Sequence, residues 1–105
     1  MDDESALIAG LRQRDPQAFA TFFEQYADRI YRLAYGIVGN EADAEEALQS
    51  TFISALEAID RFEQHARLGT WLYRIAYNHA LMILRRRRPE ESLPDEDGPL
   101  PVPSA

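Results

Sequence analysis

The sequence contains no cysteine. Disulfide bridges and thiolate metal sites are therefore excluded, and the composition fits a protein of the reducing cytoplasm. The first ten residues lack the basic start and apolar run of a secretory signal peptide. The apolar run at residues 80–84 is far too short to cross a bilayer. We therefore expect a cytoplasmic protein without membrane insertion.

Lysine is also absent, and the arginines that carry all the positive charge are unevenly distributed. The formal net charge of −7 at first argues against a nucleic-acid partner. However, residues 1–60 hold four Arg and twelve acidic residues, whereas residues 61–88 hold seven Arg and one Glu. Residues 89–105 hold five acidic residues and no basic one. Because a phosphate backbone responds to local charge, residues 61–88 remain a candidate nucleic-acid surface.

Apolar residues recur at three- and four-residue steps, which is typical of amphipathic helices, and no segment alternates like a strand. A length of 105 residues with 46% apolar content suits one small domain. Asp15 and Pro16 form a strong helix start, and Gly39 followed by Asn40 ends one helix and caps the next. We predict an all-α fold, a compact bundle of about four helices at residues 4–13, 16–38, 41–59 and 70–88.

Two segments lack helical periodicity. Residues 60–69 separate the last two helices and are predicted to form a loop. Residues 89–105 contain five of the six prolines and many acidic residues, so we expect a disordered interdomain linker or tail there. The predicted domain therefore spans residues 1–88.

The helix at residues 41–59 has an unusual outer face. Its predicted inward residues are Ala44, Leu48, Phe52, Ala55 and Ile59. At 100° per residue, the opposite side carries Glu46, Gln49, Ser50, Ile53 and Glu57. Ile53 is apolar in the middle of this polar face. It is either a stray exposed residue or part of a partner-binding site, and the periodicity alone does not decide between them.

The helix at residues 70–88 carries a more specific pattern. Its predicted inward residues are Trp71, Leu72, Ile75, Ala76, His79, Met82 and Ile83, and its outward residues are Tyr73, Arg74, Tyr77, Leu81, Leu84, Arg85 and Arg88. Tyrosines flanked by arginines suit nucleic acid, because bases stack on rings and guanidinium groups pair with phosphates. Alternatively, the two tyrosines pack on the first helix and the arginines only offset the negative end of the helix dipole.

No pattern of residues indicates catalysis. The Ser and Thr residues lack a His base with an orienting acid, and the glycines form no phosphate-binding loop. Neither His65 nor His79 has a second ligand at a metal-like spacing, and His79 faces the predicted core, where a hydrogen-bonded structural role is expected. We therefore expect a binding protein that is not an enzyme and uses no metal or cofactor.

Three stretches together resemble a known family. Residues 43–52, DAEEALQSTF, continue into ALEAIDRF at 55–62, and TWLYRIA follows at 70–76. Upstream lies DPQAFATFFEQYADRIYRLAYGIVGN at 15–40. In order and spacing, residues 5–88 resemble region 2 of bacterial extracytoplasmic-function sigma factors, which direct RNA polymerase to promoters. The resemblance implies a domain that binds RNA polymerase core and recognises and melts the promoter −10 element during transcription initiation.

The resemblance also implies roles for individual residues. Contact with the clamp helices of the polymerase β′ subunit is implied for Asp43, Glu46, Gln49, Ser50 and Ile53. Contact with promoter DNA, mainly the single-stranded −10 non-template strand, is implied for Phe62, Gln64, His65, Arg67, Thr70, Trp71, Tyr73, Arg74, Tyr77, Asn78, Arg85 and Arg88. The loop would capture a base flipped out of the −10 element, and the helix after it would contact the melted strand. Trp71 also lies on the predicted inward face.

The family implies two further components. Its members commonly have an anti-sigma partner, and they carry a second domain, a helix-turn-helix that reads the −35 element. We interpret the acidic, proline-rich residues 89–105 as the linker toward such a domain. A different class of function also fits the sequence: a sigma-like decoy or adaptor that binds an anti-sigma factor without contacting DNA. The Arg/Tyr side of the last helix favours the DNA interpretation, because a decoy does not need it.

Overall fold

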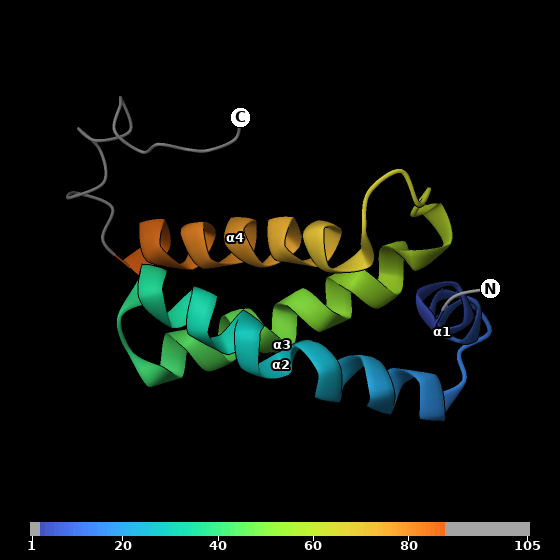
Figure 1. Ribbon diagram of the computed structural model, residues 1–105. Coiled ribbons are helices and arrows are strands. Elements are labelled where there is room, and N and C mark those ends of the chain that lie inside the picture. The colour runs from blue at the N-terminus through green and yellow to red at the C-terminus, as the bar shows by residue number, and fades with distance from the viewer. Residues whose placement is uncertain (1–2, 88–105) are drawn as a thin grey trace.

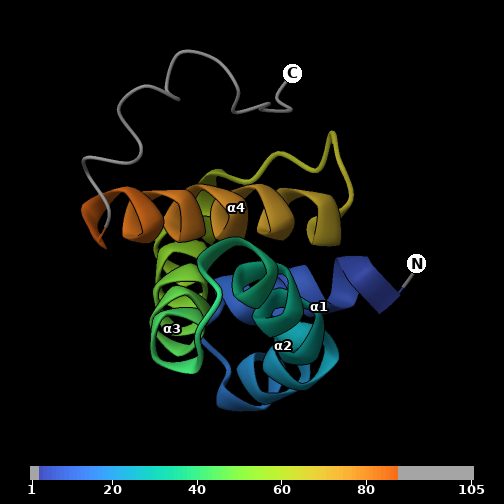
Figure 2. The same cartoon turned by 90° about the vertical axis from the view of Figure 1, so that its left-hand side faces the viewer.

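The computed structural model describes residues 3–87 as four α-helices and one short 3₁₀ helix. Helices α2 and α3 run side by side, α4 lies across both, and α1 crosses one end of the pair (Figures 1 and 2). No strand occurs in residues 3–87, which confirms the predicted all-α fold. The elements are α1 (Asp3–Arg12), α2 (Pro16–Val38), α3 (Glu41–Ala58), η1 (Ile59–Arg61) and α4 (Leu68–Arg87).

The predicted capping residues set the ends of α2 and the start of α3. Asp15 directly precedes Pro16, the first residue of α2, and its carboxylate accepts a hydrogen bond from the Gln17 amide at 3.1 Å. Gly39 has a φ of 81°, and its amide donates to the Tyr35 carbonyl, which closes the last turn of α2. The Asn40 side chain accepts from the Asp43 amide at 2.9 Å. These local signals explain why the bounds of α2 match the prediction.

The core forms where α2, α3 and α4 meet, with α1 closing one end. Its aromatic centre is Phe22 of α2 and Phe52 of α3, whose ring centroids lie 5.2 Å apart at a steep angle. Toward the other end the core contains mainly small residues, which allow the helix backbones to approach closely. The residues with no more than 1% exposure include Ile8, Leu11, Ile30, Ala34, Ala44, Ala47, Leu72, Ala76 and Ala80.

Helix α4 differs from the prediction in its start and in part of its inward face. It begins at Leu68 and not at Thr70, and residues 60–61 of the predicted loop belong to η1, so the irregular segment shortens to residues 62–67. Met82 is 54% exposed, whereas Ala80 is fully buried, so the inward position predicted for Met82 is wrong. Side chains two positions apart on an α-helix are rotated by about 200° around its axis, so Ala80 and Met82 cannot share a face. Arg88 and the predicted tail at 89–105 lie outside the described residues.

Candidate nucleic-acid interface

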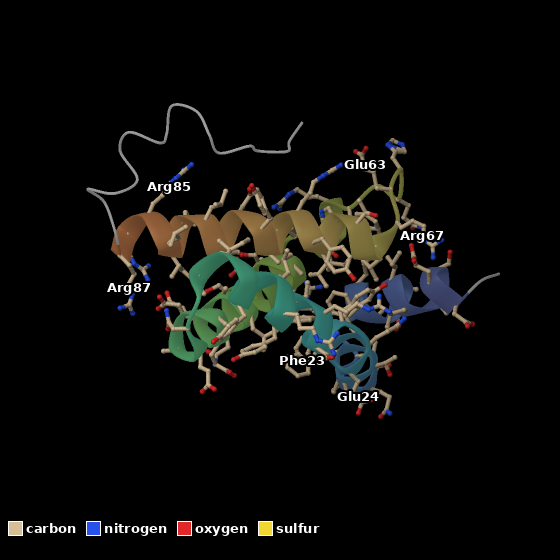
Figure 3. The ribbon with its side chains drawn as sticks, turned by 60° about the vertical axis from the view of Figure 1, so that its left-hand side comes forward. Phe23, Glu24, Glu63, Arg67, Arg85 and Arg87 are labelled. Carbon is tan, nitrogen blue, oxygen red and sulfur yellow. The ribbon has the colours of Figure 1, made fainter. Side chains whose placement is uncertain are left out.

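The outer side of α4 presents polar and charged groups to solvent. We call this set, Thr70, Arg74, Tyr77, Asn78 and Arg85, the α4 surface; Tyr77 is half-buried and the others are exposed. The outward orientation predicted for Arg74 and Arg85 is confirmed, and that of Tyr77 holds in part. Arg74 and Arg85 have no ion-pair partner among residues 3–87, and Arg85 projects away from the helical body in Figure 3. Their charges are therefore available to an external anion.

Tyr73 lies at the border between the α4 surface and the core. Its ring meets the ring of Tyr26 edge-on, with centroids 6.5 Å apart, and its hydroxyl accepts a hydrogen bond from Arg29 at 3.3 Å. This hydrogen bond raises the pKa of Arg29. Burial, followed by the charge of Glu4, raises the pKa of Tyr26. The outward orientation predicted for Tyr73 is therefore wrong, because its side chain is half-buried and packs on α2. Arg29 adds a positive charge beside the α4 surface that sequence reasoning missed.

The two arginines at the C-terminal end of α4 are paired with α3. Arg86 contacts the Glu46 carboxylate at 2.9 Å, and Arg87 contacts Asp43 at 2.9 Å. Asp43 is only 4% exposed, and its second carboxylate oxygen accepts from the Asn40 side chain at 3.0 Å. The surface position implied for Asp43 is therefore wrong, because its carboxylate links the start of α3 to the end of α4. Glu46 remains partly exposed but is engaged by Arg86.

The outer side of α3 is open. We call its outward residues, Gln49, Ser50, Ile53 and Glu57, the α3 surface. Ile53 is 59% exposed, the largest exposure of any large hydrophobic residue in the described chain. Its outward position is therefore confirmed, while a role in polymerase binding stays a prediction. On α2, Phe23 is also exposed, and Figure 3 shows it with Glu24 on the side of the molecule away from Arg85.

The 62–67 loop is anchored at its start by two aromatic rings in contact, tilted by 37°. The centroids of Phe62 and Trp71 lie 4.7 Å apart, and Phe62 is 6% exposed. The surface position implied for Phe62 is therefore wrong, because its ring fills the interior beneath the loop. Trp71 is half-buried against it, which fits the inward placement expected from the helix pattern. Together the two rings hold the beginning of the loop against the first turn of α4.

A pocket of about 520 Å³ lies beside the loop. It brings together three of the predicted loop residues, and all three are exposed: Gln64, His65 and Arg67. The rest of the lining comes from Ala66 and from the first turn of α1, namely Asp3, Glu4 and Ser5. The contribution of α1 was missed, because no local pattern indicates that residues so far apart in the sequence share a pocket.

Glu4 contributes to this site through two contacts. One carboxylate oxygen accepts a hydrogen bond from the Leu68 backbone amide at 2.9 Å, and the other lies 3.5 Å from the Arg67 guanidinium. The side chain of Glu4 is 25% exposed, whereas that of Arg67 is 80% exposed. Figure 3 shows Arg67 reaching from the loop toward α1. The first turn of α1 is thus attached to the first residue of α4.

The remaining polar groups of the interior have structural partners. His79 shares a hydrogen bond of 2.8 Å with Ser54 and so connects α4 to α3, which matches its predicted role. Within residues 3–87, no three His, Cys, Asp or Glu side chains are grouped to hold a metal ion. No helix in this range is long and apolar enough to span a membrane.

Comparison with known proteins identifies the family. Residues 22–90 match the family model described as Sigma-70 region 2, and the chain belongs to that family. SigW of Bacillus subtilis, an extracytoplasmic-function (ECF) RNA polymerase sigma factor, is 38% identical over 89 residues, or 85% of this chain. The ECF sigma factor SigE of Mycolicibacterium smegmatis is 40% identical over 80 residues, or 74% of this chain. Within the family, this is therefore an ECF sigma factor region 2.

A solved structure supports the same assignment. The NMR structure of an engineered region 2 of sigmaE in complex with GTAAAA has a TM-score of 0.70 and is 29% identical. The alignment covers 86% of this chain and 99% of that one. By contrast, the chain spans 48% of the length of SigW and 31% of that of SigE. The chain therefore matches nearly all of the solved region 2 but less than half of the length of these two curated relatives.

Proposed function

We propose that this domain binds the clamp helices of the RNA polymerase β′ subunit with the α3 surface, and the −10 element with the α4 surface and the 62–67 loop. The observation that carries the DNA part is the unpaired charge of Arg74 and Arg85 on the same face as Tyr77. The similar region 2 that was solved in complex with GTAAAA supports this assignment. In this proposal the domain acts in the cytoplasm, which contains both RNA polymerase and the chromosome.

The proposed mechanism requires binding energy and no chemical step. Extruding a base from duplex DNA costs a few kcal/mol. Stacking on aromatic groups returns about 1–3 kcal/mol per base, and each phosphate paired with an arginine adds a salt-dependent contribution. The pocket of about 520 Å³ beside the loop is large enough to receive an extruded base. Promoter melting in this proposal is therefore capture of unpaired bases, without catalysis or a cofactor.

The charge distribution favours one orientation on DNA. Acidic side chains are exposed on α2 and α3, including Glu24, Glu45 and Glu57. A phosphate backbone is repelled from that side and attracted to the α4 surface. Few phosphates can be neutralised by so small a basic area, so the domain alone binds duplex DNA weakly. Polymerase, held on the α3 surface, supplies the remaining affinity.

Charge reversal at Arg74 tests the DNA assignment. Arg74→Glu is expected to weaken binding to a fluorescent single strand containing GTAAAA and to lower the slope of log affinity against log salt by about 0.7, since one phosphate contact is lost. The measurement is fluorescence anisotropy over a salt series. Arg32→Glu is the matched control, because Arg32 is an exposed arginine of α2 paired only with Asp28. Equal isotherms for the two variants would refute the DNA assignment.

A sigma-like decoy or adaptor that binds an anti-sigma factor remains the other candidate. That function does not use the two unpaired arginines on the face of α4 that carries Tyr77. Binding of an anti-sigma protein together with no affinity for the single strand in the same assay would favour the decoy.

A further inference from the structure

Helix α1 holds the 62–67 loop at both ends. At the start of the loop, the Arg12 guanidinium donates to the carbonyls of Ile59, at 3.2 Å, and Phe62. At its end, the Glu4 carboxylate accepts from the Leu68 amide and contacts Arg67. Glu4 and Arg12 are about 12 Å apart along the axis of α1 at 1.5 Å per residue. One rigid element therefore fixes the separation of the two ends of the loop.

The contact from Glu4 replaces a cap that the local sequence does not provide. The first residues of a helix leave amides without intrahelical partners, and Ser, Thr, Asp or Asn usually accepts from them. The residue before α4 is Arg67, whose side chain has no acceptor, although its carbonyl accepts from the Trp71 amide at 3.1 Å. The carboxylate of Glu4 also brings negative charge to the positive end of the helix dipole. The start of α4 thus depends on α1.

The loop itself has few internal contacts. The one side-chain pair within the loop, Glu63 with His65 at 3.6 Å, is exposed and contributes little. Gln64 has a φ of 60°, a left-handed conformation that a residue with a side chain adopts only when its surroundings fix it. The loop conformation is therefore set mainly from outside, by α1 and by the buried anchors at its two ends.

We propose that Glu4 is a positioning residue that holds the 62–67 loop in the shape that receives an extruded base. This inference rests on the proposed function and deepens it, because it adds α1 to the base-binding machinery. Glu4 acts through the Leu68 amide and Arg67, and its negative charge itself disfavours DNA. Two opposite effects follow: removal of the carboxylate weakens capture of the base and relieves repulsion of the strand.

The binding test separates these two effects. The probes are a fluorescent single strand containing GTAAAA and a set of strands with one nucleotide at a time made abasic. For the unchanged 105-residue chain, each abasic strand is compared with the intact strand, and the position at which base removal lowers the affinity most identifies the captured base. Glu4→Ala is expected to reduce that loss by roughly three- to tenfold. The strand that is abasic at this position should bind Glu4→Ala at least as tightly as it binds the unchanged chain.

Two further variants sharpen the result. Glu4→Gln keeps an oxygen that accepts from the Leu68 amide but loses the charge, so an intermediate discrimination is expected. Glu24→Ala removes an exposed carboxylate of α2 that lies far from the loop in Figure 3. It should leave unchanged the loss of affinity that the abasic position causes. A purely structural role of Glu4 would lower the affinity for every strand alike and would not give opposite shifts.

Amide hydrogen exchange tests the positioning without DNA. In Glu4→Ala, exchange at the Leu68 amide should accelerate because its acceptor is lost, while the interior of α3 keeps its protection. If the unchanged chain discriminates among the strands and Glu4→Ala preserves both the discrimination and the slow exchange, this inference is overturned and the proposed function stands. If the unchanged chain binds none of the strands, the proposed function fails, and the exchange data still decide whether Glu4 holds the loop.

Discussion

Asp43 is a buried acid near the start of α3. As the third residue of α3, it suits a helix N-terminus, and within the family motif it suggests a surface contact. In the structure it is buried and contacts both Asn40 and Arg87. Neither the spacing nor the charge pattern indicates that the end of α4 returns to this point. The partner of a charge depends on tertiary structure, so sequence reasoning could not separate Arg87, which is paired, from Arg85, which is unpaired.

Asp43→Ala is expected to lower the free energy of unfolding by about 1–3 kcal/mol, because the Asn40 side chain loses its buried acceptor and Arg87 loses its ion pair. Urea denaturation followed by circular dichroism measures this change. Glu45→Ala is the matched control on the same helix, since Glu45 is exposed and has no ion-pair partner among residues 3–87. Its effect should stay within about 0.5 kcal/mol. Similar losses in both variants would contradict a structural role for Asp43.

At the scale of elements, the sequence predicts most where the signals are local. Asp15, Gly39 and Asn40 define the ends of α2 and the start of α3, and each acts through its nearest neighbours. The start of α4 was placed two residues late, because its amide is capped by Glu4 from another helix. The outward direction of Ile53 was predictable from helical periodicity, whereas the pocket between α1 and the 62–67 loop was not.

The packing of α1 on α2 depends on close approach of two small residues. A Cβ atom added at Gly10 would lie 2.7 Å from the Cβ of Ala18, so Gly10→Ala must push the two helices apart. We expect a loss of about 1–2 kcal/mol in unfolding free energy, despite the better helix propensity of alanine. Gly36→Ala, where nothing lies within 4 Å, should instead gain up to about 0.5 kcal/mol. Thermal denaturation measures the midpoint of unfolding of both variants, and shifts of this midpoint in the same direction would contradict this packing.

At the scale of the whole molecule, the proposed working surfaces lie on different helices and do not share residues. The α4 surface carries the unpaired positive charge, and the α3 surface carries the exposed Ile53. The core between them holds α3 and α4 together through Phe52, Leu72 and the Ser54–His79 hydrogen bond. Because no hydrogen bond or ion pair within residues 3–87 joins the outward residues of one surface to those of the other, changes on the two should act independently on binding.

This separation predicts opposite outcomes for two variants. Ile53→Glu is expected to weaken binding to a β′ clamp-helix fragment by about tenfold or more, because a charge replaces an exposed apolar contact at a protein interface. It should leave the single-strand affinity unchanged. Arg74→Glu should show the reverse pattern. For each variant, pull-down measures binding of the clamp fragment, and fluorescence anisotropy measures the affinity for the single DNA strand.

Met82→Glu is the control for adding an acid at an exposed apolar position, since Met82 is 54% exposed and lies outside the α3 surface. Met82→Glu should still bind the clamp fragment if Ile53→Glu loses binding because of the position of Ile53 and not because of the added charge. Because Ile53 is 59% exposed, its replacement should cost little stability, so unchanged helicity by circular dichroism is expected. Full retention of the clamp fragment by Ile53→Glu would remove α3 from the polymerase contact while leaving the DNA assignment of α4 intact.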